Sequence, residues 1–504
     1  MYFVLNTIYP ELRTVKRKET MDWILLFEIF YAIILFLVIL RVLYDTRSSV
    51  KALAYILFII FIPFVGILFY FSFGINYRKR KLYSKKIVRD NDLRQEIRNR
   101  MFTYSDEVLN SGLVLETHHN LVEFVRRTNS SPLTANSSVK LLLNGEEKFP
   151  ELLRAIEAAR SHIHLEYYIY EDDATGQSIA DALIRKAMQG VEVRFMYDDF
   201  GSNGLKRPFI ERLEAAGVQT APFYKIKLLA LANRLNYRNH RKIIIIDGET
   251  SFVGGINISD RYRNDSLAQS DLFWRDTHLM LKGPASSYLQ YLFLCDWNFC
   301  SNDELIYNPS YFPPPPSSLG LEKEIVQLVS SGPDSELPVI FYSFLEAIGA
   351  ARKRILITSP YFIPGESLMD ALIIAAKGGL QVQILVPGKS DSKMVNAAAR
   401  SYYTELLKHG VQIFLYEKGF VHAKTMVIDD DLSIVGSANM DYRSFDLNFE
   451  VNALIYSQEI TAQLERAFEN DLEHASEIKA TDWLNRPKYK HLWEKLVRLL
   501  SPFL

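Results

Sequence analysis

The sequence is poor in cysteine, with only Cys295 and Cys300 among 504 residues. Two cysteines are too few for a disulfide framework, and they lack the partner pairs of a zinc site. The sequence therefore predicts that the bulk of the chain lies in a reducing compartment, and it predicts neither a metal nor another cofactor.

The chain also lacks an excess of charge of either sign, since its formal net charge is −1. A protein without a global field does not collect a polyanion, so we expect no nucleic-acid partner. An anionic ligand must be bound by local groups instead. The length exceeds what one hydrophobic core usually serves, and it indicates two or three folded units.

Long hydrophobic runs are present only near the N-terminus. Residues 52–73 hold no charged side chain, and residues 23–43 are nearly as apolar. Each run is long enough to cross a hydrocarbon layer of about 30 Å as a helix. We therefore predict a two-helix transmembrane hairpin within residues 1–80, although Pro63 and Gly66 also allow a shallower, kinked hairpin that does not fully cross.

Basic residues flank this hairpin on both sides. Four precede it, at positions 13, 16, 17 and 18, and six follow it, at positions 78–81, 85 and 86. The positive-inside rule then places both chain ends in the cytoplasm, so we expect a multi-pass protein of the bacterial inner or plasma membrane with cytoplasmic catalytic domains. The basic cluster would face anionic lipid.

The rest of the chain is an internal repeat. The stretch "LRAIEAARSHIHLEYYIY" from Leu153 aligns with "LEAIGAARKRILITSPYF" from Leu345. Helical patterns alternate with strands in both copies, which predicts an α/β fold with two similar domains of mixed, largely parallel sheets flanked by helices. We place a connecting segment at 81–136, the first domain at 137–310, a proline-rich linker at 311–335, and the second domain, with an amphipathic C-terminal tail, at 336–504.

Each copy ends in the same motif, "HRKIIIID" from His240 and "HAKTMVID" from His422, followed by "GGIN" or "GSAN". Two such matches in register are not accidental. The repeated positions are His240, Lys242, Asp247 and Asn257 in the first copy and His422, Lys424, Asp429 and Asn439 in the second.

These residue types suit attack on a phosphodiester. One imidazole attacks phosphorus while a second protonates the departing alkoxide, and lysine and asparagine side chains stabilise the negative oxygens without a metal. Asp276 and Glu450, which follow the two motifs, are candidates to hold the far ring nitrogens of the histidines. Asp247 and Asp429 are expected to brace loops. Each copy would thus supply half of one shared active site.

The paired motifs resemble those of the phospholipase D superfamily. The N-terminal apolar segment, the contexts "RNHRK" and "FWRDTHL", and "SPYFIP" from Ser359 make the whole chain similar to bacterial cardiolipin synthases. The resemblance implies transfer of a phosphatidyl group from one phosphatidylglycerol to another with release of glycerol, through a phosphohistidine. Spacing alone does not identify the nucleophile, and the resemblance favours His240, with His422 as acid and base.

Three classes of function remain open on the sequence. A membrane-bound hydrolase, or a transferase with another alcohol acceptor, would use the same phosphohistidine. A nuclease is disfavoured by the membrane segment and the neutral net charge. A silent scaffold would be expected to lose a motif residue, and none is lost. The oligomeric state is not indicated.

Overall fold

The computed structural model describes residues 10–46, 49–71, 95, 101–112, 116–223, 237–265, 272–301, 303, 305–314 and 324–501. The chain forms two units, one of residues 1–79 with 228–236 and one of the remaining residues. The basic cluster at 78–86, the end of the second predicted span and the centre of the predicted linker lie outside the described residues.

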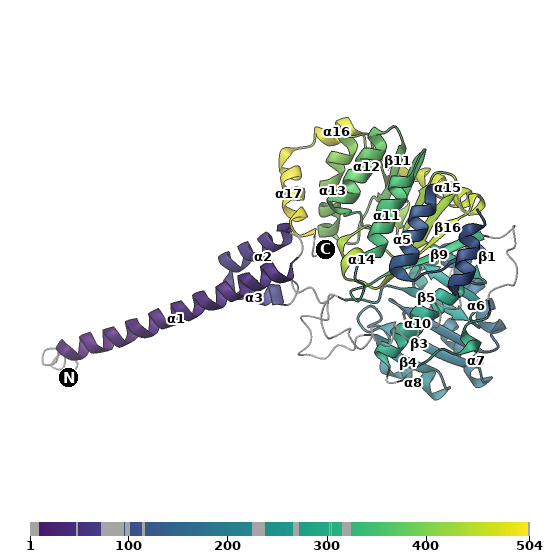
Figure 1. Cartoon of the computed structure of the whole chain (residues 1–504), viewed down its shortest axis with the longest axis horizontal. Helices are drawn as coiled ribbons and strands as arrows, with labels where there is room; N and C mark the ends of the chain where they lie inside the picture. The colour runs from purple at the N-terminus through teal and green to yellow at the C-terminus, as the bar shows by residue number, and fades with distance from the viewer. Residues whose placement is uncertain are drawn as a thin grey trace. The chain divides into compact units, whose positions relative to one another are not determined.

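The N-terminal unit holds three helices, α1 (Pro10–Asp45), α2 (Ser49–Phe61) and α3 (Pro63–Phe69) (Figure 1). Within the described residues, one stretch is long and apolar enough to cross a membrane, Leu25–Asp45 in α1. The second predicted span, over 52–73, is not confirmed, because the helix is interrupted at Ile62 and Pro63 begins a new one. At 13 residues, α2 is only about 20 Å long.

The second unit contains α5 (His119–Asn129) and both repeats. The first repeat is built of β1 (Leu133–Leu143), α6 (Asn144–Ala158), β2 (His162–Tyr167), α7 (Ala174–Met188), β3 (Glu192–Asp198), α8 (Arg207–Ala215), β4 (Gln219–Phe223), β5 (Lys242–Ile246), β6 (Thr250–Gly254), β7 (Phe273–Arg275), β8 (Thr277–Lys282) and α10 (Ser286–Cys300).

The second repeat follows the same order and adds a C-terminal extension. It is built of β9 (Glu324–Ser331), α11 (Val339–Ala350), β10 (Arg354–Thr358), α12 (Gly365–Lys377), β11 (Gln381–Pro387), α13 (Lys393–Lys408), β12 (Gln412–Tyr416), β13 (Gly419–Val421), β14 (Thr425–Ile428), β15 (Leu432–Gly436), α14 (Tyr442–Asp446), β16 (Glu450–Tyr456), α15 (Gln458–Leu472), β17 (Ala475–Glu477), α16 (Ala480–Leu484) and α17 (Lys488–Arg498). The linker predicted at 311–335 therefore includes a strand, β9.

The two repeats form one 15-stranded sheet, joined where β1 pairs antiparallel with β9. In the first repeat only β2, β3 and β4 are parallel neighbours, and α7 and α8 provide the crossover connections between them. Strands β5, β6 and β8 pair antiparallel. The prediction of largely parallel sheets is thus wrong, and the correct description is a mixed sheet in which antiparallel pairs dominate.

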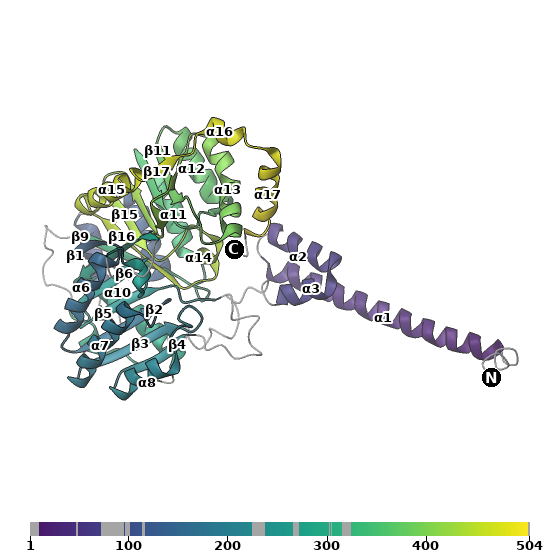
Figure 2. The ribbon, with the colours of Figure 1, turned by 180° about the vertical axis from the view of Figure 1, so that it is seen from behind.

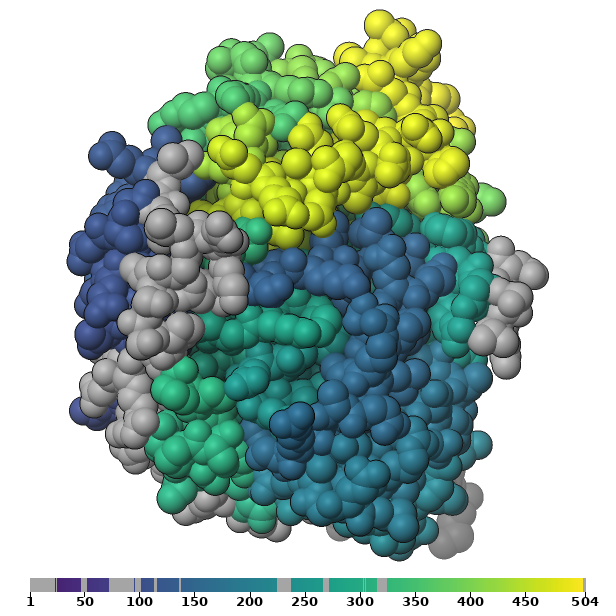
Figure 3. Space-filling model, turned by 90° about the vertical axis from the view of Figure 1, so that its right-hand side faces the viewer, coloured from purple at the N-terminus to yellow at the C-terminus, as the bar shows by residue number. Residues whose placement is uncertain are grey.

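Helices cover both faces of this sheet (Figures 1 and 2). In the first repeat α6, α7 and α8 pack on one face, and α10 packs on β2 and β5 from the other. In the second repeat α11, α12 and α13 take the places of α6, α7 and α8, and α15 takes the place of α10. Figure 3 shows the two repeats meeting along one face of the molecule. This arrangement brings equivalent segments of the repeats together near β1 and β9.

Candidate active site

His240 is positioned by the backbone of the opposite repeat. Its N–H group donates to the carbonyl of Phe449 over 2.9 Å, and the N–H of Phe449 donates to the carbonyl of Arg238 over 2.8 Å. The residue after Phe449 is Glu450, which begins β16. The same pair of backbone bonds that fixes His240 therefore fixes the carboxylate next to its ring.

His422 is held in an equivalent way from the first repeat. Its N–H group donates to the carbonyl of Arg275 over 2.7 Å, at the end of the short parallel pair of β7 and β13. The residue after Arg275 is Asp276. Each motif histidine thus lies beside the carboxylate that follows its backbone partner.

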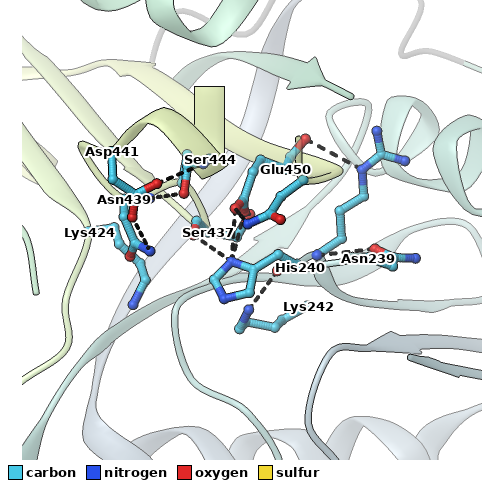
Figure 4. Close-up of polar contacts among 12 residues, drawn as sticks. Asn239, His240, Lys242, Lys424, Ser437, Asn439, Asp441, Ser444 and Glu450 are labelled. Carbon is cyan, nitrogen blue, oxygen red and sulfur yellow. Dashed lines mark hydrogen bonds and ion pairs between the residues drawn. The ribbon is translucent and has the colours of Figure 1, made fainter. Parts of the chain in front are cut away.

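The two carboxylates are exchanged between the repeats. A carboxylate oxygen of Glu450 lies 2.9 Å from Nδ1 of His240 (Figure 4), and one of Asp276 lies 2.7 Å from Nδ1 of His422. Both acids were predicted to hold a histidine, and both do. Each holds the histidine of the other repeat, so neither repeat contains a complete histidine and carboxylate pair.

Two lysines lie beside the imidazoles. Nζ of Lys242 donates to the carbonyl of His240 over 2.5 Å, and Nζ of Lys424 lies 2.9 Å from Nδ1 of His422. Burial and the field of Lys424 lower the pKa of Lys242 to about 7, and burial lowers the pKa of Lys424 to about 8, while the carboxylate of Glu450 opposes both shifts. The effect of Lys424 on Lys242 means that the two motifs share one site.

Both imidazoles are neutral in the free site. Burial and the field of Lys424 lower the pKa of His422 to about 3, and burial also lowers the pKa of His240. A neutral imidazole is the nucleophilic form. The negative charge of a bound phosphodiester opposes these shifts, so an imidazole beside it takes up a proton more readily.

The two asparagines of the motifs lie near the histidines but are bonded to protein groups. Nδ2 of Asn257 donates to the hydroxyl of Tyr262 over 2.6 Å, and its Oδ1 accepts from the N–H of Ile169. Nδ2 of Asn439 donates to Asp441 over 3.1 Å. The structure therefore gives both asparagines a role in bracing the site, and contact with substrate stays a prediction.

Asp247 and Asp429 lie at the far ends of the strands that carry the motifs. Asp247 accepts from the N–H groups of residues 160–162, and Asp429 accepts from those of residues 352–354. Both have positive φ angles, at 54° and 52°. Both aspartates therefore hold loops in place, and neither carboxylate contacts a motif imidazole or lysine among the described residues.

Aromatic rings that the sequence did not single out line the site. The ring of Tyr168 lies 4.7 Å from that of His240, and the ring of Trp274 lies 5.6 Å from that of His422. Trp274 lies two residues before Asp276 along an extended segment, so both side chains face the same side. This spacing could have identified Trp274 from the sequence. Tyr168 offers no comparable local signal.

A family model described as "Cardiolipin synthase, PLD-like domain" matches residues 152–279 and 344–472, one match in each repeat. The chain belongs to the cardiolipin synthase family. Its enzyme class is therefore the phosphatidyltransferases of the phospholipase D superfamily. A second model, "Phospholipase_D-nuclease N-terminal", matches residues 31–74.

Individual relatives agree with this assignment to the cardiolipin synthase family. A cardiolipin synthase of Halalkalibacterium halodurans is 40% identical over 477 residues, which is 94% of this chain and 92% of that protein. The major cardiolipin synthase of Bacillus subtilis is 39% identical over 490 residues, covering 95% and 99%. A solved phosphatidylserine synthase of Haemophilus influenzae shares the fold, with a TM-score of 0.56, 17% identity, and coverage of 76% of this chain and all of that one.

Proposed function

We propose that this enzyme transfers a phosphatidyl group from one phosphatidylglycerol to a second, forming cardiolipin and releasing glycerol through a phosphohistidine. One observation carries the proposal. Two neutral imidazoles, each held by a carboxylate of the other repeat, share a buried site with two lysines. Such a site has one group to attack phosphorus, one to move a proton and two cations for the phosphate oxygens.

The chemistry runs in two displacements. With the phosphodiester bound, one imidazole stays neutral and the other takes up a proton to become an imidazolium. The nitrogen of the neutral imidazole forms a bond to phosphorus while the glycerol oxygen leaves with the proton of the imidazolium, which becomes neutral. The hydroxyl of the second lipid then gives its proton to that imidazole, and its oxygen replaces the histidine nitrogen on phosphorus. The family resemblance makes His240 the nucleophile. Lys242 and Lys424 neutralise the charge that both transition states place on the equatorial oxygens.

The membrane would supply both substrates. We propose that α1 crosses the inner or plasma membrane and that the catalytic unit lies on the cytoplasmic side, where the basic residues 78–86 face anionic lipid. Exposed apolar residues on α17 support a further contact with the headgroup layer, as its predicted amphipathic character suggests. They are Leu492, Trp493, Leu496 and Leu499.

A product analysis tests the proposed activity. The purified full-length protein is given phosphatidylglycerol as sole lipid in detergent, and cardiolipin, glycerol and phosphatidic acid are measured together. Cardiolipin with an equal amount of glycerol, absent with His422→Ala, is the expected result. Phosphatidic acid and glycerol without cardiolipin would contradict the proposal and indicate a hydrolase.

A further inference from the structure

Arg238, two residues before His240, is a buried cation that forms no ion pair with any described carboxylate. The residue is 3% exposed, yet within the described part of the chain its guanidinium makes no hydrogen bond or ion pair. It lies over the ring of Phe200, with 4.2 Å between the guanidinium carbon and the ring centre. A buried guanidinium with unused donors is costly unless an anion meets it.

The nearby carboxylate does not fill this need. Asp198 attracts Arg238 electrostatically, but its two oxygens accept hydrogen bonds from the backbone N–H groups of Phe200, Gly201 and Asn239. The acid therefore braces the loop after β3. The donors of Arg238 remain available to a ligand.

A second arginine, Arg443, comes from the other repeat and is tied to the same turn. The N–H of Phe449 donates to the carbonyl of Arg238 over 2.8 Å, and the N–H of the preceding Asn448 donates to the carbonyl of Arg443 over 2.9 Å. Arg443 is half-buried on α14, and its guanidinium also makes no hydrogen bond or ion pair among the described residues. Burial lowers the pKa of Arg238, and the field of Arg443 lowers it further. Two neighbouring guanidinium groups whose donors meet no described carboxylate are the arrangement that a phosphate or carboxylate stabilises.

Tyr168 places the pair next to the reacting groups. The fields of Arg238 and Arg443 both act on its hydroxyl, while its ring lies 4.7 Å from that of His240 and 5.3 Å from Nζ of Lys242. The arginines are therefore one side chain away from the catalytic centre.

The pair occurs on one side of the site only. The position equivalent to Arg238, two residues before His422, holds Phe420. The position equivalent to Arg443, four residues after the motif asparagine, holds Arg261, which is paired with Glu171. The groups expected to bind the reacting phosphate, such as the two lysines, occur once in each repeat. The arginine pair has no equivalent on the other side of the site, which indicates that it binds a different anion.

We propose that Arg238 and Arg443 bind the phosphodiester group of the acceptor lipid. The inference rests on the proposed cardiolipin synthesis, because only an acceptor with a phosphate of its own needs this site. In phosphatidylglycerol that phosphate is separated by a three-carbon glycerol from the hydroxyl that attacks phosphorus. The pair thus selects a lipid alcohol over water or free glycerol.

Two reactions of the same donor test this assignment. Cardiolipin formation needs an acceptor phosphate, whereas exchange of the glycerol headgroup with labelled free glycerol does not. Both rates are measured with the full-length enzyme and phosphatidylglycerol in detergent, for Arg443→Gln and Arg238→Gln. We expect the ratio of cardiolipin formation to exchange to fall about 10- to 100-fold, as loss of a charge-assisted contact implies. Arg261→Gln is the matched control, and its ratio should equal that of the wild type.

Each other outcome has a defined meaning. An unchanged ratio in both variants, whether the rates fall together or persist, would overturn the acceptor site. Inorganic phosphate that inhibits exchange in the wild type but not in Arg443→Gln would assign the pair to free phosphate and also overturn it. Exchange by the wild type without any cardiolipin would instead refute the proposed function itself.

A separate inference concerns how the N-terminal unit meets the bilayer. The helices α2 and α3 fold back on each other, since the rings of Tyr55 and Tyr70 lie 5.4 Å apart and those of Phe58 and Phe69 lie 5.3 Å apart. Gly66 allows this approach, because a Cβ there would lie 2.7 Å from Cα of Ile59.

The end of α3 returns to the end of α1. The hydroxyl of Tyr70 donates to the carbonyl of Arg41 over 3.2 Å and to the carboxylate of Asp45 over 3.4 Å. The turn between α2 and α3 lies further back along α1, with the ring of Phe64 at 6.2 Å from that of Tyr31. The chain therefore leaves α3 beside the Asp45 end of α1, which is also the end from which it enters α2.

We infer that α1 crosses the membrane once and that α2 and α3 form a re-entrant pair, so the N-terminus and the catalytic unit lie on opposite sides. The basic residues fit this topology, because nine flank the Asp45 end (Arg41, Arg47, Lys51, Arg78, Lys79, Arg80, Lys81, Lys85 and Lys86) and four precede α1's apolar stretch (Arg13, Lys16, Arg17 and Lys18).

Cysteine labelling in intact cells tests the topology. Single cysteines are introduced by Thr14→Cys, Ser48→Cys or Ser84→Cys in full-length protein whose Cys295 and Cys300 are replaced by serine, and cardiolipin formation serves as the folding control. We expect a membrane-impermeant maleimide to label Thr14→Cys in intact cells and the other two only after permeabilisation. Labelling that puts Thr14→Cys and Ser84→Cys on the same side would overturn the inference and restore the two-span hairpin.

Discussion

The two histidine environments differ although the repeats that carry them share a fold. Nδ1 of His422 faces the carboxylate of Asp276 and the amine of Lys424, whereas Nδ1 of His240 faces Glu450 and, at 3.2 Å, the carbonyl of Ser437. The hydroxyl of Ser437 donates to Glu450, and its counterpart, Gly255, leaves room for Asp276. Duplication thus supplied two equivalent sites, and small changes around each carboxylate gave the two imidazoles different hydrogen-bond partners.

Removing either imidazole is expected to have the largest effect. His240→Ala and His422→Ala should each lower cardiolipin formation by about 10³-fold or more, because the attacking group or the proton carrier is lost. Membrane association should persist, as sedimentation with vesicles would show. A variant that keeps activity near that of the wild type would contradict the shared site.

A substrate with an activated leaving group separates the two roles. The 4-nitrophenyl ester of phosphatidic acid releases nitrophenolate without a proton donor. If His240 is the nucleophile, as the resemblance implies, His422→Ala should still release about one equivalent per enzyme in a burst, and His240→Ala should release none. The reverse pattern would exchange the roles.

The carboxylates should differ in importance. Asp276→Asn and Glu450→Gln each remove the charge that orients an imidazole, which costs on the order of 10²- to 10⁴-fold in kcat. We expect the larger loss in Asp276→Asn, since the Ser437 carbonyl still accepts from His240 in Glu450→Gln. Equal losses, measured by initial rates in detergent, would show that this carbonyl does not orient the ring.

The lowered pKa values of Lys242 and Lys424 predict opposite effects of pH on activity and on stability. Their pKa values of about 7 and 8 lie below the unfolded value, so kcat/KM should fall as pH rises through this range and the phosphate loses its cations. The unfolded chain binds more protons there, so the free energy of unfolding should rise from about pH 7 to about 10. Lys424→Arg, with an arginine that stays charged, should move the alkaline limb of the rate profile upward.

The smallest effect is expected at the loop braces. Asp247→Asn and Asp429→Asn should each lower the free energy of unfolding by about 1–2 kcal/mol, since one charged acceptor of backbone N–H groups becomes neutral. Asparagine tolerates the positive φ angle, so both variants should fold. Thermal unfolding in detergent measures the loss, and a kcat far below that of the wild type in either variant would mean that the motif aspartates act in catalysis.

The sequence predicted the catalytic side chains because His, Lys and Asp stand at fixed spacing on one strand in each repeat. It also predicted which acids hold the histidines. It did not predict that Asp276 and Glu450 cross between repeats, because that pairing depends on backbone bonds from His240 and His422 to distant segments. The second span was predicted but is not confirmed, for a similar reason. The composition shows that residues 52–73 are apolar, but it does not show that Gly66 lets α3 lie against α2.

The exchange of carboxylates also bears on how such an enzyme arises. A single repeat has a histidine but not the acid that orients it, so a one-repeat ancestor could work only as a symmetric pair of chains, each lending its acid to the other. Fusion into one polypeptide removed the requirement that both copies stay identical. From then on, one side of the molecule could hold an arginine, Arg238, where the other holds a phenylalanine, Phe420.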